Sequence, residues 1–289
     1  MKQVDFLCAM WYTLCGNSCM ENRKERTMDY GCAYTNFKEI IDTMESQGYD
    51  WKQEIGAINE AQKKRNAQVE FSLSDHVKAM VYAMLSSNRP WDGIVRNSDK
   101  INAVFKNFDV DYLLSASPTE LEQQLTEIKC GNRQIKRQMN SLRSNIKTLQ
   151  QIATDFGSID DYYNSADKYI LIKSLSNSGQ KYKLKYMGVA LVCEYLKGVG
   201  VDIIKPDVHV RRIIGRLGYS KHNPATVRET MDVCKAIAEE YNLSQAAVDA
   251  IFWQYGANAK FKICDSEPKC NLCNVKNCPS RKILSDIVS

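Results

Sequence analysis

Four cysteines near the end of the chain are the residues with the clearest potential for chemistry. Cys264, Cys270, Cys273 and Cys278 lie within fifteen residues and are separated by five, two and four residues. A loop this short brings four thiolates around one inorganic group, and one Cys-x-x-Cys pair with two outlying cysteines suits a [4Fe–4S] cluster. Zinc is the alternative, although it more usually takes two such pairs with a longer spacer. Four unliganded thiols this close together would oxidise readily, so a bound group is expected.

Asp207 is the second residue with a chemical role in view. It follows Pro206 and stands at the start of a segment with helical periodicity. The simplest role of a carboxylate there is to cap the helix, because it accepts hydrogen bonds from free backbone N–H groups and interacts favourably with the helix dipole. Capping does not exclude catalysis.

Composition and length limit the classes of protein that this chain can represent. Its 289 residues can bury a sizeable core without disulfide bonds, although there are eleven cysteines. The first residues lack the features of a signal peptide, so we expect a reducing, cytoplasmic compartment such as a bacterial or phage-like cytosol. No window has the eighteen or more uninterrupted apolar residues that a membrane span needs.

The distribution of charge favours a polyanionic partner for most of the chain. Residues 1–75 carry nine Lys and Arg against twelve Asp and Glu, whereas residues 76–289 carry thirty against twenty-two. A basic excess of this kind is typical of proteins that bind nucleic acid, although lysine-rich surfaces are also common elsewhere. The run from Arg133 to Lys147 predicts a basic helix, for which a solvated outer face is the favoured interpretation.

Helical periodicity extends through most of the chain after residue 35, and strands are scarce, which predicts an all-α protein. Ser74, Ser117 and Ser244 are expected N-caps, and the GVG at 198–200 reads as a helix C-cap and turn. The expected helices cover residues 74–88, 99–108, 118–128, 131–156, 182–197, 207–217, 225–241 and 244–256. A second cysteine group has spacings that match no ligand pattern, and reduced thiols are expected there: Cys8, Cys15, Cys19 and Cys32.

Together these motifs resemble the helix–hairpin–helix DNA glycosylases of the endonuclease III type. Asp207, His209 and Arg212 form an Asp-x-His-x-x-Arg pattern about fifty residues before the cysteine loop, and the aspartate of this motif is the family's catalytic carboxylate. The segment MLSSNRPWD is similar to the family's helix end that leads into a DNA-probing loop, with Asn88 in the place of a glutamine. The resemblance implies DNA contacts at Asn88, Arg89 and His209, and a [4Fe–4S] cluster on the four C-terminal cysteines.

The hairpin departs from the family pattern. The family has Leu-Pro-Gly-x-Gly there, whose bare backbone amides approach a phosphate, and enzymes that also cut the strand follow it with Lys-Thr-Ala. This chain has YKLKYMGVALV at 182–192, and Gly188 or Met187 falls at the lysine position. Lys181, Lys183 and Lys185 are therefore expected to contact phosphate electrostatically in place of backbone amides, or one of them to reach the pocket from an altered hairpin. Without the lysine amine, hydrolysis without strand cleavage is expected.

The resemblance implies a two-lobed fold with a helical barrel domain and an iron–sulfur cluster domain. We expect an N-terminal extension over 1–72 that packs with the cluster domain, a barrel domain over 73–204 with a degenerate hairpin, and the catalytic-Asp helix and cluster domain over 205–289. The implied function is a monomeric DNA glycosylase that excises a damaged or modified base flipped out of duplex DNA. Two alternatives stay open, namely modified-base processing on a glycosylase-like fold and a non-catalytic iron–sulfur DNA-binding protein.

Overall fold

A computed structural model of the chain describes residues 31–54, 56–257 and 262–281, and these residues form helices and connecting loops with no strand. The all-α prediction is therefore confirmed. The helices are α2 (Gly31–Ser46), α3 (Trp51–Glu54), α4 (Gly56–Asn66), α5 (Leu73–Leu85), α6 (Trp91–Arg96), α7 (Ser98–Val104), α8 (Val110–Ser115), α9 (Pro118–Glu127), α10 (Ile135–Phe156), α11 (Ile159–Ser165), α12 (Lys168–Ser176), α13 (Val189–Gly198), α14 (Val208–Arg216), α15 (Val227–Glu240) and α16 (Gln245–Ala257). In the described part of the chain, no helix is long and apolar enough to span a bilayer.

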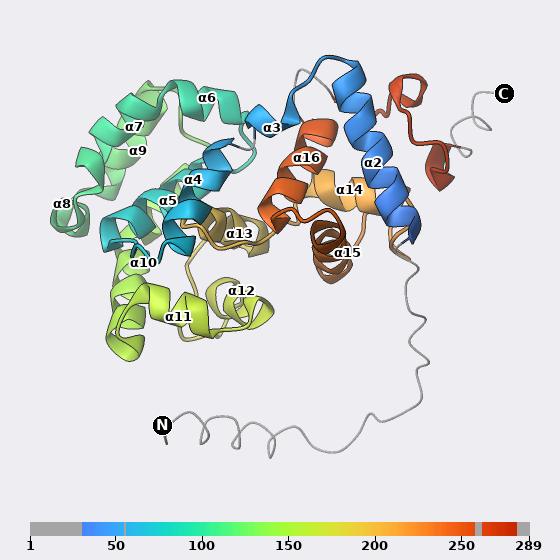
Figure 1. Ribbon diagram of the computed structural model, residues 1–289. Coiled ribbons are helices and arrows are strands. Elements are labelled where there is room, and N and C mark those ends of the chain that lie inside the picture. The colour runs from blue at the N-terminus through green and yellow to red at the C-terminus, as the bar shows by residue number, and fades with distance from the viewer. Residues whose placement is uncertain (1–30, 55, 258–261, 282–289) are drawn as a thin grey trace, which may run out of the picture.

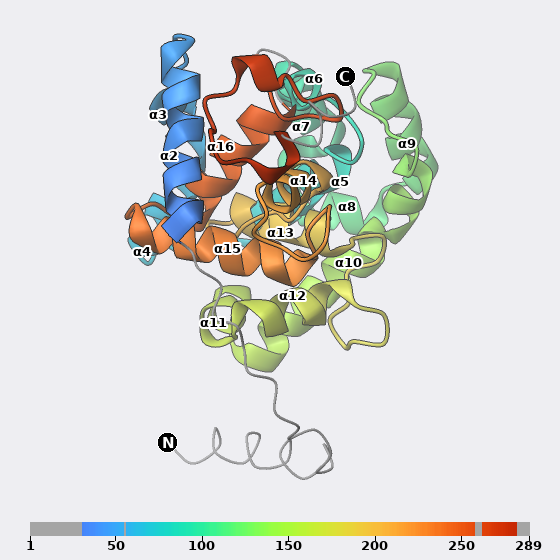
Figure 2. The same cartoon turned by 90° about the vertical axis from the view of Figure 1, so that its right-hand side faces the viewer.

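The helices form two groups (Figures 1 and 2). One group runs from α4 to α13, with α5 packed along α13 and against α10. The other holds α14, α15, α16 and the cysteine loop, and α2 packs on α15 and α16 from the other end of the described chain. The loop before α14 connects the two groups, so Asp207 lies where the chain passes from one to the other.

Local capping explains several helix boundaries. Ser117 caps α9 by accepting from the N–H of Glu120, and Ser244 accepts from the N–H of Ala247 at 3.1 Å, as the sequence predicts. The prediction for α5 was wrong by two residues. Ser72 is its N-cap, because Asp75 completes a capping box with Ser72, whereas Ser74 donates to the carbonyl of Phe108 at 2.9 Å.

The glycines after α13 behave as the sequence predicts. Gly200 has a φ of +75°, which a residue with a side chain rarely adopts, and its N–H donates to the carbonyl of Lys197 at 2.9 Å. A Cβ at Gly200 would lie 2.2 Å from the carbonyl oxygen of Ala61 in α4. The glycine therefore both ends α13 and allows α4 to pack closely against this turn.

Helix α2 covers the group that contains the cysteine loop. Its Phe37 ring packs edge-on against Phe252 of α16, with ring centroids 5.3 Å apart. Thr43 accepts from the backbone N–H of Asn274 at 3.1 Å, and Glu39 accepts from the N–H of Lys276 at 3.1 Å. A segment far away in the sequence thus supports the backbone between the last two cysteines of the loop.

The expected helix over 182–197 is present only from Val189. Residues 177–188 form a loop between α12 and α13, and the buried side chains of Leu184 and Met187 fix it to the core. Tyr186 has a φ of 58°, which is incompatible with a continuing helix. Tertiary contacts override the helical periodicity of this segment, and we call the loop at 177–188 the hairpin.

Candidate active site and cysteine loop

Asp207 is the N-cap of α14. Its Oδ1 accepts from the backbone N–H of His209 at 2.8 Å and of Val210 at 3.2 Å. Among the residues that the structure describes, no hydrogen bond to Oδ2 is found, and the side chain is half-buried. One carboxylate oxygen therefore holds the helix start, which fixes the direction of the group, while the other is available to a bound molecule. The cap role and a chemical role are compatible in this geometry.

A buried group of ion pairs lies close enough to Asp207 for its charge to shift their pKa values. Lys197 of α13 binds the carboxylate of Asp249 of α16, and its Nζ is 3.6 Å from Oε2 of Glu194. Lys205 reaches the same Oε2 at 3.2 Å. Only 3% of the Asp249 side chain and 13% of the Lys197 side chain are exposed. The buried pair of Lys197 and Asp249 joins α13 to α16 near the capping carboxylate of Asp207.

The pKa values of these groups show how they influence one another. Burial raises the pKa of Asp249 to about 6, with Asp207 adding to the rise and Lys197 opposing it. Burial opposes the charge on Lys197, but Asp249, Glu194 and Asp207 outweigh it and hold its pKa above the ordinary value. Lys197 is therefore protonated at neutral pH, and its positive charge offsets part of the negative charge beside Asp207.

His209 follows two residues after Asp207, and its position is tightly restricted. Its Cβ lies 3.5 Å from the position that a Cβ on Gly256 would take, so α14 and α16 approach closely there. Its Nδ1 is buried and has no hydrogen-bond partner in the described part of the chain. Such an atom favours a ligand or water partner. The predicted contact of His209 with DNA remains a prediction.

The three hairpin lysines lie in different environments. Lys181 is exposed and pairs with Asp155 of α10 at 2.6 Å. The ammonium group of Lys183 turns into its own loop, where it donates to the carbonyl of Leu184 at 2.8 Å and to that of Met187. Burial lowers the pKa of Lys183. The side chain of Lys185 is exposed and free to meet a phosphate.

Helix α10 fixes the backbone of this loop. Asn145, which is fully buried, accepts from the N–H of Lys185 at 2.7 Å and donates to the carbonyl of Lys185 at 3.1 Å. Ser141 adds a longer contact to the same carbonyl at 3.5 Å. One residue of the loop is therefore held on both sides of its backbone by a single amide side chain from α10.

Asn88 and Arg89 lie in the turn between α5 and α6, because the helix expected over 74–88 ends earlier, at Leu85. Asn88 is exposed with a φ of 53°, in the left-handed region that asparagine tolerates better than most residues. Arg89 donates to the carbonyl of Lys129, in the loop that leads to α10. Asn132 in that loop donates to the carbonyl of Met84 at 2.9 Å. The turn is thus attached to the start of α10.

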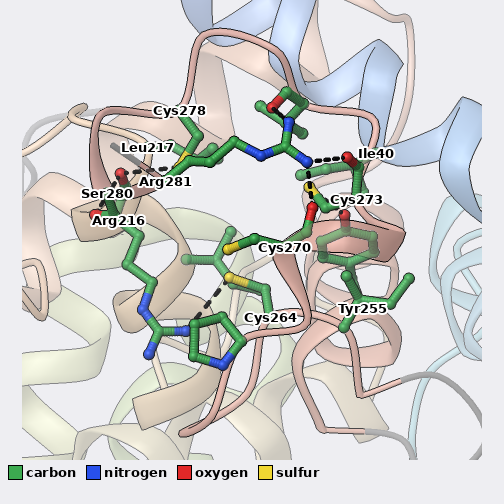
Figure 3. A pocket seen from close by; sticks show the side chains of 14 residues that line it. Ile40, Arg216, Leu217, Tyr255, Cys264, Cys270, Cys273, Cys278, Ser280 and Arg281 are labelled. Atoms are coloured by element: carbon green, nitrogen blue, oxygen red, sulfur yellow. Dashed lines mark hydrogen bonds between the residues drawn. The ribbon is translucent and has the colours of Figure 1, made fainter. Parts of the chain in front are cut away.

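The four C-terminal cysteines line one cavity, which Figure 3 shows between α14, α16 and the cysteine loop. Arg216, the last residue of α14, has its Nη1 3.5 Å from the Sγ of Cys264. Tyr255 donates to the Sγ of Cys273 at 3.0 Å. In the described ranges, no three possible ligands converge as they would around a single metal ion.

Positive side chains also hold the backbone of the loop. Arg281 donates to the carbonyls of Cys270, Cys273 and Val275, the last at 3.0 Å. Arg216 donates to the carbonyls of Asp265 and Ser266. Two guanidinium groups thus lie at the cavity (Figure 3), and their charge suits a group with anionic sulfur ligands. Since α14 is nine residues long, about 13 Å separates its capping Asp207 from the loop contacts at its other end.

Comparisons with known proteins identify the fold. No protein-family model matches the sequence, and no curated protein matches it significantly. The crystal structure of Methanocaldococcus jannaschii 8-oxoguanine glycosylase/lyase in complex with DNA containing 8-oxoguanine is similar, with a TM-score of 0.52, 21% sequence identity, and coverage of 75% of this chain and 95% of that chain. A second structure, of 8-oxoguanine DNA glycosylase from the same organism, has a TM-score of 0.53 and 21% identity and covers 78% and 97%.

The chain therefore shares the all-helical fold of these two 8-oxoguanine glycosylase structures. This fold agrees with the resemblance of its sequence motifs to the helix–hairpin–helix DNA glycosylases.

Several predicted site residues are brought together, and others are not. The four cysteines share a cavity, and α14 connects them to Asp207. The cysteines at 8, 15 and 19 lie outside the described residues, as does the side chain of Cys32. Sequence reasoning missed the pair formed by Lys197 and Asp249. A charge within each apolar stretch, LVCEYLKG and AAVDAIF, was the available signal, because a charged residue on a buried face usually has a partner.

Proposed function

We propose that this protein is a DNA glycosylase that hydrolyses the N-glycosidic bond of a damaged or modified base. The observation that carries the proposal is Asp207, which caps α14 with one carboxylate oxygen and leaves the other unpaired among the described residues. It stands in a fold shared with glycosylases. A flipped nucleotide in front of α14 would bring its sugar to this oxygen.

Asp207 acts by charge. Breaking the N-glycosidic bond builds positive charge at C1′ of the sugar, and a fixed carboxylate stabilises that charge without reorganising. The same oxygen orients or deprotonates the attacking water. The two backbone N–H groups at Oδ1 hold the carboxylate in one orientation, and the protonated Lys197 behind it lowers the cost of placing two acidic groups close together.

Hydrolysis without strand cleavage is the expected reaction of this site. A lyase needs a neutral amine to attack the sugar, and the first turn of α13 has none, because its N-cap is Gly188 and the preceding Met187 is buried. Lys183 donates to loop carbonyls, and Lys197 is held protonated in its ion pairs. The M. jannaschii protein is described as a glycosylase/lyase, so a monofunctional reaction would distinguish this chain from it.

We further propose that Cys264, Cys270, Cys273 and Cys278 hold a [4Fe–4S] cluster. Four thiols around one cavity provide one sulfur for each iron, and a single Cys-x-x-Cys pair with two outlying cysteines suits a cluster better than the two pairs usual for zinc. Arg216 and Tyr255 supply hydrogen bonds to the ligand sulfurs, as groups around such clusters do. Such a group, when bound, fixes the loop and its exposed lysines Lys262, Lys269 and Lys276 for phosphate contacts.

The proposal is tested with purified protein and duplexes that each contain one altered base. The first altered base is 8-oxoguanine, because the similar structures are those of 8-oxoguanine glycosylases. We expect one duplex to yield a free base and an intact abasic strand, which breaks only after alkali. Borohydride should trap no covalent adduct. A trapped adduct would contradict the monofunctional reaction and identify an attacking amine, and no base release from any duplex would contradict the glycosylase assignment.

A further inference from the structure

The outer face of α10 carries positive charge that nothing in the described part of the chain neutralises. Lys136, Arg137, Arg143 and Lys147 are exposed on this face, with Arg133 just before the first turn. None of these five has a carboxylate within 4.0 Å among the residues that the structure describes. We call these five residues the basic face of α10.

A solvated helix surface usually mixes charges, and α15 shows that pattern. Its Arg228 lies 3.7 Å from Asp232, and its Lys235 lies 3.8 Å from Glu239, each one turn along the same helix. Helix α10 has a single acidic residue, Asp155, in its last turn. Hydrogen bonds from Lys181, Tyr182 and Gln151 lower the pKa of Asp155 to about 2, so its charge is already engaged. Solvation alone therefore does not explain why the exposed charges of α10 are nearly all positive.

The basic face also lies between the two loops for which the sequence predicts DNA contacts, namely the Asn88 turn and the hairpin. At one end of α10, Gln138 donates to the carbonyl of Met84 at 3.3 Å, and Arg89 reaches the loop that leads into the helix. Further along, Asn145 holds Lys185 of the hairpin. In Figure 2 the loop after α12 projects beside α10. A shallow groove between them is lined by Asn140, Arg143, Lys147 and Lys181, among others.

We propose that the basic face of α10 binds the phosphate backbone of duplex DNA, continuing the contact between the Asn88 turn and the hairpin. The distance from Lys136 to Lys147 is about 17 Å at the helical rise, which matches the axial length of about five base pairs. Arginine and lysine side chains on such a path contact phosphates without reading sequence. The inference rests on the proposed function only in requiring that the protein binds DNA.

The test compares two triple variants that remove the same net charge. The first is Lys136→Gln with Arg137→Gln and Lys147→Gln, all exposed on the basic face of α10. The control is Lys38→Gln with Lys63→Gln and Lys235→Gln, which are exposed cations that pair with carboxylates of their own helices. Affinity for an undamaged duplex is measured for both variants and the wild type over a range of salt concentrations.

The α10 variant should lose affinity, and its slope of log affinity against log salt should become shallower by about 2.7, since each phosphate contact contributes roughly 0.9. The control should keep the wild-type slope. Equal slopes for the wild type and the α10 variant would overturn the proposal and assign the face to solvent. Because the duplex is undamaged and only binding is measured, failure of base excision would leave this result unaffected, and failure here would leave the excision assay unaffected.

Discussion

The hairpin loop at 177–188 and the cysteine loop at 262–281 are both irregular, yet they are held in different ways. Protein groups alone hold the hairpin: Lys183 donates to two of its carbonyls, and Asn145 of α10 binds the backbone of Lys185 on both sides. The cysteine loop is supported from outside by Arg216 and by residues of α2, and its four thiol groups surround a cavity.

This difference concerns what each loop needs in order to fold. The hairpin places two apolar side chains in the core, so its shape follows from the chain alone. The cysteine loop also places only two apolar side chains in the core, Ile263 and Val275, although it is longer, and its four thiol groups line a cavity. A loop of this kind usually folds together with its metal group. We therefore expect the cysteine loop to depend on its ligand and the hairpin to be independent of it.

Replacing a cysteine ligand should have the largest effect. The wild type should be brown and contain about four iron and four sulfide per chain, and Cys270→Ser should lose most of both. DNA affinity should fall as well, while the helical circular dichroism signal is largely kept, because the helices from α4 to α13 do not depend on the loop. Cys130→Ser, which alters a buried thiol before α10, should keep the iron.

The comparison is wrong if Cys270→Ser loses all helical signal along with its iron. A colourless wild type that contains one zinc ion would contradict the [4Fe–4S] assignment, although the cysteine loop would still depend on a metal.

Asn145→Ala should produce a smaller effect that is confined to stability and the hairpin. The change removes both hydrogen bonds to the backbone of Lys185 and should lower the free energy of unfolding by about 2 kcal/mol. Urea unfolding and DNA affinity would both be measured, and iron content should not change. Asn140→Ala on the exposed face of α10 is the matched control for stability, with an expected change below about 0.5 kcal/mol.

If Asn145→Ala were as stable as the control, the hairpin would not be held by α10. A loss of iron in this variant would contradict the independence of the two loops.

The smallest effects should separate Lys183 from Lys185. Lys183→Met removes the ammonium group that binds the loop carbonyls and should lower stability by about 1 kcal/mol, with no change in the salt dependence of DNA binding. Lys185→Met should leave stability unchanged and reduce the slope of log affinity against log salt by about 0.9, as the loss of one phosphate contact does. The opposite pattern would show that Lys183 turns outward to meet DNA.

The sequence predicts the parts of this molecule that depend on local chemistry. Ser117, Ser244 and Asp207 cap helices as expected, and Gly200 ends α13, because capping involves residues only a few positions apart. The cysteine spacing likewise predicts one shared site, and the four thiols do line one cavity.

Features that depend on distant residues could not be predicted in this way. The segment 182–188 has helical periodicity, but Asn145, about forty positions earlier, holds it as a loop. The pair between Lys197 and Asp249 joins residues of two helices that are remote in sequence. The covering of the cysteine loop by α2 depends on contacts such as that of Thr43 with Asn274. None of these has a local signal that selects its partner.

The most direct test of the proposed function is the rate of base release by Asp207→Asn. Asparagine keeps the size and the oxygen that caps α14, so the fold and lesion-DNA binding should be preserved. It removes the negative charge, so single-turnover base release should fall on the order of a hundredfold or more. The wild-type rate in this variant, on the duplex that the wild type cleaves, would contradict the catalytic role of Asp207 and leave it as a helix cap alone.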